Sequence, residues 1–125
     1  MAGATSAVNV QAMAARGSAA PGNNANANIL VLVTDPKTGA GVTTLTQGNF
    51  TVVDHFGIPG QSCGFSNNIT SFNNVLTGAY QITVATHSAN PPGGGCKWVA
   101  GDYLGQVMVR TPKVQGQAAF LLSIR

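Results

Sequence analysis

The stretch Ala79-Tyr80-Gln81-Ile82-Thr83-Val84 decides the fold of this chain. Apolar and polar side chains alternate along it, which is the pattern of a β-strand that packs one face on a core. We therefore expect its tyrosine, isoleucine and valine to point inward, and its glutamine and threonine to point outward. A tyrosine in this position can bury its ring and bond a neighbouring backbone group through its hydroxyl.

Other short apolar or alternating segments flank this strand, and turn residues bound them. The turn after residue 33 contains Asp35, Pro36 and Gly39, in which proline fixes φ and glycine accepts a positive φ. No convincing helical period occurs outside the N-terminal region. About seven short, turn-bounded strands predict an all-β fold, a two-sheet antiparallel sandwich. The expected strands occupy residues 29–33, 50–54, 63–65, 69–76, 79–84, 104–110 and 118–124.

The N-terminal region differs in composition from the rest of the chain. Alanine, asparagine, glycine and serine dominate residues 1–28, which predicts an extended tail or assembly arm before a sandwich domain at 29–125. Within the tail, Val8, Val10 and Ala12 alternate with polar residues, a weak strand pattern. The run at 12–16 fits a short helix equally well, so both readings stay open.

Ionisable side chains are scarce. Charged residues make up 7% of the chain, against about 25% in an average domain. Neutral polar groups must therefore keep the surface soluble, as on secreted, cell-surface and particle-forming β-proteins. We expect an extracellular or cell-surface location, with the signal peptide absent from this sequence, or a place in a virion or other particle.

The charge pattern and the hydropathy exclude two classes of partner. The net charge is +3, but the six basic residues are scattered, whereas a nucleic-acid reader needs a cluster of them. No apolar stretch approaches the ~20 residues that cross a bilayer, so no membrane span is expected.

Cys63 and Cys96 are the only cysteines, and both lie in glycine-rich sequence. A disulfide between them would close a long loop and stabilise the fold by about 3–4 kcal/mol. The alternative is a pair of buried thiols in a reducing compartment. The loop-like sequence around both residues favours the disulfide.

No catalytic apparatus is recognisable, and we expect no enzyme activity, no cofactor and no metal. Asp54 and His55 are neighbours on a strand, so their side chains point to opposite faces, and the aspartate is poorly placed to orient the histidine. A zinc site would need three or four ligands, which His55 and His87 supply only together with both cysteines in reduced form. We interpret the histidines as solvated loop residues.

Three motifs, in this order, resemble bacterial immunoglobulin-like modules of secreted and cell-surface proteins. They are Thr34-Asp35 followed by Val42-Thr43-Thr44-Leu45-Thr46-Gln47-Gly48-Asn49-Phe50, then Gly78-Ala79-Tyr80-Gln81-Ile82-Thr83-Val84, then Trp98-Val99-Ala100-Gly101-Asp102-Tyr103. The resemblance covers residues 29–124 and implies an immunoglobulin-like sandwich. Such modules act as stalks, spacers, adhesion modules or assembly units and share no catalytic residues, so no residue role transfers.

Two functions remain. The first is a structural or assembly subunit, a homo-oligomer or a protein-bound unit, whose tail adds a strand to a neighbour through Val8, Val10 and Ala12. The second is a ligand-binding or adhesion module, with carbohydrate as a candidate ligand. Its site would lie in loops 54–62 and 86–98, with His55, His87 and Trp98 as candidate residues.

Overall fold

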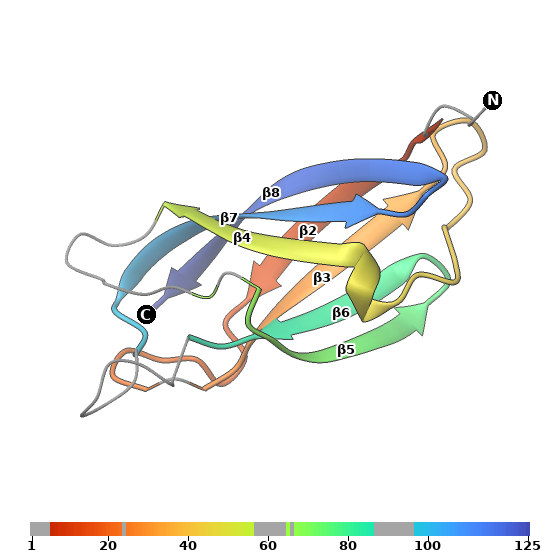
Figure 1. Cartoon of the computed structure of the whole chain (residues 1–125). Helices are drawn as coiled ribbons and strands as arrows, with labels where there is room; N and C mark the ends of the chain where they lie inside the picture. The colour runs from red at the N-terminus through yellow and green to blue at the C-terminus, as the bar shows by residue number, and fades with distance from the viewer. Residues whose placement is uncertain (1–5, 24, 57–64, 66, 87–96) are drawn as a thin grey trace.

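Two β-sheets of four strands each pack against each other in the computed structural model (Figure 1). The structure describes residues 6–23, 25–56, 65, 67–86 and 97–125. One sheet has the order β1-β8-β7-β4 and the other the order β2-β3-β6-β5. The strands are β1 (Ser6–Ala7), β2 (Asn9–Ala15), β3 (Ala27–Thr34), β4 (Phe50–Phe56), β5 (Ile69–Leu76), β6 (Ala79–Val84), β7 (Gly101–Arg110) and β8 (Val114–Ile124).

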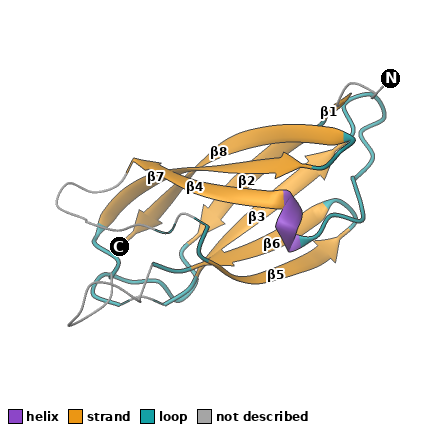
Figure 2. Ribbon diagram, in the orientation of Figure 1, coloured by secondary structure: helices purple, strands orange, loops and turns teal. Residues whose placement is uncertain are grey.

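The predicted all-β class is confirmed, because the described residues contain no α-helix. Their one helical element is a single 3-10 turn, Gln47–Asn49, which leads into β4 (Figure 2). Strands were predicted within β3 to β8, and each is present. The expected strand at 63–65 differs: residues 63 and 64 lie outside the described residues, and Phe65 is not in a strand.

The N-terminal region supplies two strands that the count of about seven left out. Both lie at sheet edges: β2 pairs with β3 and β1 pairs with β8. The pairing of β1 with β8 is parallel, whereas a purely antiparallel sandwich was expected. The direction follows from the path of the chain. The N-terminal segment crosses from the sheet that contains β8 to the sheet that contains β3 without reversing, so β1 and β2 run in the same direction.

Alternation along β6 places its side chains as predicted, with one difference in exposure. Tyr80, Ile82 and Val84 are fully buried between the sheets. Thr83 lies on the outer side but is only 7% exposed. Its hydroxyl donates to the Asn28 side-chain oxygen at 3.1 Å, because β6 is a central strand with β3 at its side.

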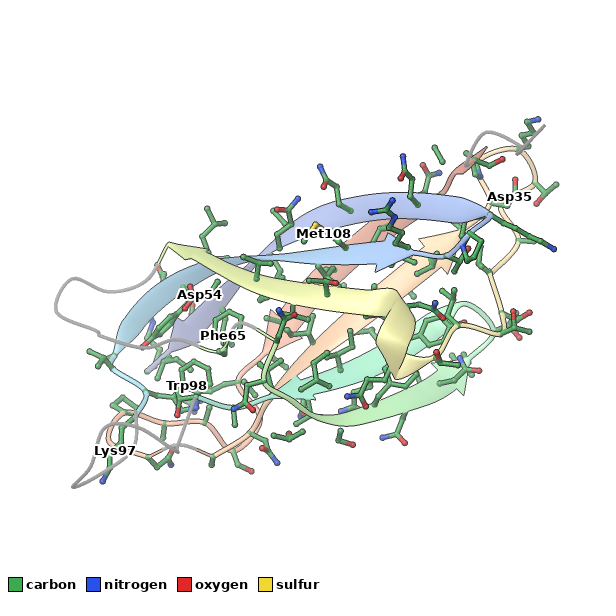
Figure 3. All side chains as sticks on the ribbon, in the orientation of Figure 1. Asp35, Asp54, Phe65, Lys97, Trp98 and Met108 are labelled. Atoms are coloured by element: carbon green, nitrogen blue, oxygen red, sulfur yellow. The ribbon has the colours of Figure 1, made fainter. Side chains whose placement is uncertain are left out.

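Aromatic rings fill both ends of the core. At one end Phe72 stacks on Tyr80 with ring centroids 5.6 Å apart, and Phe50 packs on both. At the other end Phe65 contacts Trp98 and Tyr103, as Figure 3 shows for Phe65 and Trp98 between the sheets. The two ends close the interior that the aliphatic side chains of both sheets fill.

The turn and the tyrosine predictions are both confirmed. The Asp35 carboxylate accepts hydrogen bonds from the backbone N–H groups of Lys37 at 2.7 Å and Thr38 at 3.2 Å, and Gly39 has a φ of 75°. The Tyr80 hydroxyl donates to the Val42 carbonyl at 2.7 Å. This bond ties the segment between β3 and β4 to the core.

The lack of a side chain at Gly105 of β7 makes room for the Phe120 ring of β8. Gly105 pairs with Phe120, and a Cβ at Gly105 would lie 2.3 Å from the tip of the Phe120 ring. The ring therefore packs directly on the glycine backbone. A single glycine within a strand often marks such a close approach.

We expect Gly105→Ala to lower the free energy of unfolding by about 1–3 kcal/mol, because the ring of Phe120 must move within a packed core. Gly48→Ala is the matched control, since its Cβ would meet nothing nearer than 3.9 Å; a change within about 0.5 kcal/mol is expected there. Urea denaturation followed by tryptophan fluorescence measures both. Equal stability of the two variants would contradict this packing role.

Candidate interaction surfaces

The first candidate surface is the part of β3 and β8 against which residues 6–15 pack, and we call it the seat of the N-terminal strands. Strand β2 pairs with β3 over seven residues, from Asn9 opposite Thr34 to Ala15 opposite Asn28. The candidate assembly residues Val8, Val10 and Ala12 therefore lie against the core of their own chain, and Val8 is only 8% exposed. The strand reading of this segment is confirmed. The alternative of a short helix at 12–16 is wrong, because residues 12–15 belong to β2.

The seat is shaped to the strand at Gly116 of β8. The backbone N–H groups of Ser6 and Val8 donate to the carbonyls of Lys113 and Gln115, each at 2.9 Å. A Cβ at Gly116 would lie 2.6 Å from the Val8 carbonyl oxygen and 2.8 Å from a methyl of Val10. The N-terminal strand can approach β8 this closely only because no side chain stands there. Gly116 was not among the predicted sites, although a lone glycine between strand residues can indicate a close approach of another backbone.

The loop that joins β2 to β3 is fastened to Trp98. The Trp98 backbone donates to the Asn23 carbonyl at 2.7 Å and accepts from the Gly22 N–H at 2.9 Å. The indole N–H donates to the Ala25 carbonyl at 2.7 Å. Trp98 is an anchor of the core, since it is only 1% exposed. Its ring presents no face to a sugar in solution.

The second candidate surface, the loops 54–62 and 86–98, is described only in part. His87, Cys63 and Cys96 lie outside the described residues, and so does the predicted disulfide. His55 belongs to β4, so the interpretation of this histidine as a loop residue is wrong, and residues 54–56 of the predicted loop 54–62 are part of the strand. The described residues bring none of the other candidate ligand residues to Trp98.

Tyr103 and Asp54 lie at this end of the sandwich. The Tyr103 hydroxyl accepts from the Val99 N–H at 2.9 Å and lies 3.3 Å from the Val99 carbonyl. Burial raises the pKa of Tyr103; the hydrogen bond to Val99 opposes this shift, and the negative charge of Asp54 adds to it. The Tyr103 hydroxyl therefore keeps its proton to a higher pH than a solvent-exposed tyrosine does. The hydroxyl is used to hold the backbone that follows Trp98.

Within the described ranges, no group of three or more histidine, cysteine, aspartate or glutamate side chains is placed to hold a metal ion. No helix in the same ranges is long and apolar enough to cross a membrane.

The comparisons with known proteins give no relative. No family model matches the chain, and neither a curated protein nor a solved structure matches it.

We expect Gly116→Ala to loosen the N-terminal strand, because the added methyl meets the Val8 carbonyl. Amide hydrogen exchange in a peptide that covers residues 6–15 should become faster than in the wild-type protein. Gln117→Ala, an exposed change at the next position of β8, is the control and should leave this exchange unaltered. Unchanged exchange in Gly116→Ala would show that the close approach does not hold the strand.

A second expectation concerns alkaline pH. The folded-state pKa of Tyr103 lies above its unfolded value of about 10. The stabilisation is therefore fully present below pH ~10 and is lost as the pH rises through the folded pKa. Urea unfolding from pH 9 to 11 should show a fall in stability that is shallower in Tyr103→Phe, with pH 7 as the reference for each protein. Identical slopes would contradict this assignment.

Proposed function

We propose that the chain is a non-catalytic structural subunit with an immunoglobulin-like fold, and that it assembles with copies of itself by exchange of the N-terminal strand. The observation that carries the proposal is the fit between residues 6–15 and their seat. An extracellular, cell-surface or particle location belongs to the same proposal.

The strand order supports the immunoglobulin-like assignment. Constant-type immunoglobulin domains have one sheet in the order A-B-E-D and a second made of strands G, F and C. With β2 to β8 taken as A to G, the sheets β2-β3-β6-β5 and β8-β7-β4 have the same orders. One departure is the buried tryptophan, which precedes the sixth of these strands in this chain and lies on the third in antibody domains.

The contacts of the N-terminal strand support its exchange between copies. Its interactions are seven backbone pairs with β3, the hydrogen bonds to β8 and the burial of small or branched apolar side chains. The same segment of a second copy would make identical contacts on the same seat. Exchange of an identical element is a low-cost route to association for this reason, and strand addition supplies its backbone bonds.

The low charge supports close packing of identical subunits. Nine charged residues in 125 produce little repulsion between copies. The alternative of a carbohydrate-binding or adhesion module has less support than the assembly proposal, because sugar stacking needs exposed rings and Trp98 is buried.

The test is the mass of the full chain in solution, by sedimentation velocity over a range of concentrations. We expect association that increases with concentration and decreases when a synthetic peptide of residues 4–16 is added, because the peptide competes for the seat. The control peptide carries Val8→Asp and Val10→Asp and should have no effect, since charged side chains cannot enter the core. A wild-type chain that stays monomeric throughout would end the proposal. If the competing peptide leaves the association unchanged, strand exchange is not the mode of association.

A further inference from the structure

The outer face of β7 carries a self-complementary row of side chains. The inward residues of this strand, Tyr103, Gly105, Val107 and Val109, lie in the sandwich. The outward residues therefore form one row on the other face of the sheet. In chain order the row reads acid, apolar, amide, apolar, base: Asp102, Leu104, Gln106, Met108 and Arg110.

This order has a geometric consequence for two copies that meet face to face. A twofold axis that lies in the interface, perpendicular to β7 at Gln106, reverses the row of the second copy. Asp102 then faces Arg110 of the second copy, and Leu104 faces its Met108. Both contacts occur twice, which is the property of an isologous interface.

The shape of the face follows the same symmetry. At one end Leu104 of β7 and Leu121 of β8 are cross-strand partners and stand in solvent, 43% and 56% exposed. At the other end a shallow hollow of about 410 Å³ is lined by residues that include Met108, Arg110 and Gln117. Met108 is labelled on this side of β7 in Figure 3. Because Met108 pairs with Gln117 as Leu104 pairs with Leu121, the twofold axis sets each leucine pair over the hollow of the other copy.

The Asp102 carboxylate already forms an ion pair with Arg125 of its own chain, and one of its two oxygens remains for a contact across the axis. The Asp102 oxygen Oδ1 accepts from the Ser123 hydroxyl at 2.7 Å and from the Arg125 guanidinium at 3.2 Å, which leaves Oδ2 without a partner among the described residues. The Arg110 guanidinium makes no hydrogen bond or ion pair with any residue in the described ranges. Pairs of this kind at a rim add little affinity, but they fix the orientation of the partners.

We propose that this outer face of β7 and β8 is a twofold interface between two copies of the chain, with the Leu104–Leu121 pair of each copy in the hollow of the other. The interface rests on the proposed function in that the chain associates with itself, but it uses a surface distinct from the seat of the N-terminal strand. Ten strand residues and two strands give a face of about 34 by 10 Å, or roughly 350 Å² per copy. This is below the ~800 Å² per partner of a standard interface, so the dimer depends on concentration.

A charge-reversal mixing experiment tests the orientation. Asp102→Arg makes both ends of the row basic, and Arg110→Asp makes both ends acidic, so each variant alone repels its own copies across the axis. An equimolar mixture restores an acid opposite a base at both ends. With the competing peptide of residues 4–16 present throughout, sedimentation should show monomers for each variant alone and a species of twice the chain mass for the mixture. A mixture that stays monomeric, while the wild type dimerises, overturns the twofold arrangement.

A leucine test addresses the apolar contact. Leu104→Lys and Leu121→Lys should each raise the dissociation constant of the dimer at least about tenfold, since a buried apolar side chain is lost. Leu76→Lys on β5 of the other sheet is the matched control, because Leu76 is 72% exposed and lies off the face. Lys37→Asp is the control for the charge reversals, since it changes one base to an acid in the turn after β3. Equal effects of variants and controls overturn the interface.

Thermal unfolding of each variant shows whether it is folded. The mixture is a second check on folding, because a dimer that forms only when the two variants are combined requires that both of them are folded. Failure of the interface is distinguishable from failure of the proposed function. If the wild-type chain associates and only the peptide disperses it, the face is not an interface and strand exchange stands. If the wild-type chain never associates, both proposals fall.

Discussion

The packing and hydrogen bonds of Trp98 hold together parts of the chain that are far apart in sequence. Its ring lies 5.3 Å from that of Tyr103 and 5.9 Å from that of Phe65, measured between centroids. Its backbone and its indole N–H bond the loop between β2 and β3. Since that loop connects the C-terminal end of β2 to the start of β3, the tryptophan fixes where the N-terminal strand ends and the first central strand begins.

The two proposed contacts between copies have different physical origins. Strand exchange would repeat interactions that the chain already makes within itself, so its driving force is visible in the seat of residues 6–15. The face of β7 would form new contacts, so its evidence is complementarity in shape and charge between the two ends of one row. A surface with few charges suits both, because desolvating neutral groups costs less than desolvating charges.

Several roles could be predicted from single residues. Tyr80 was expected in the core from the alternation of β6, which is visible in six letters of sequence, and Asp35 and Gly39 were expected in the turn after residue 33. Gly105 and Gly116 could not be interpreted in this way, because each glycine is explained by a neighbour from another strand. The exposed leucines were part of predicted strands, yet nothing local showed that Leu104 and Leu121 would be partners.

The sequence by itself determined the all-β class, the positions of the main strands and the scarcity of ionisable groups, because alternation, turn residues and composition are local properties. Tertiary structure alone decided that the N-terminal region pairs with both sheets, since its weak pattern of small side chains becomes a strand only where β3 and β8 offer backbone partners. It also decided which face of β7 is turned to solvent. Both decisions depend on contacts between residues that lie far apart along the chain, which periodicity within one segment cannot encode.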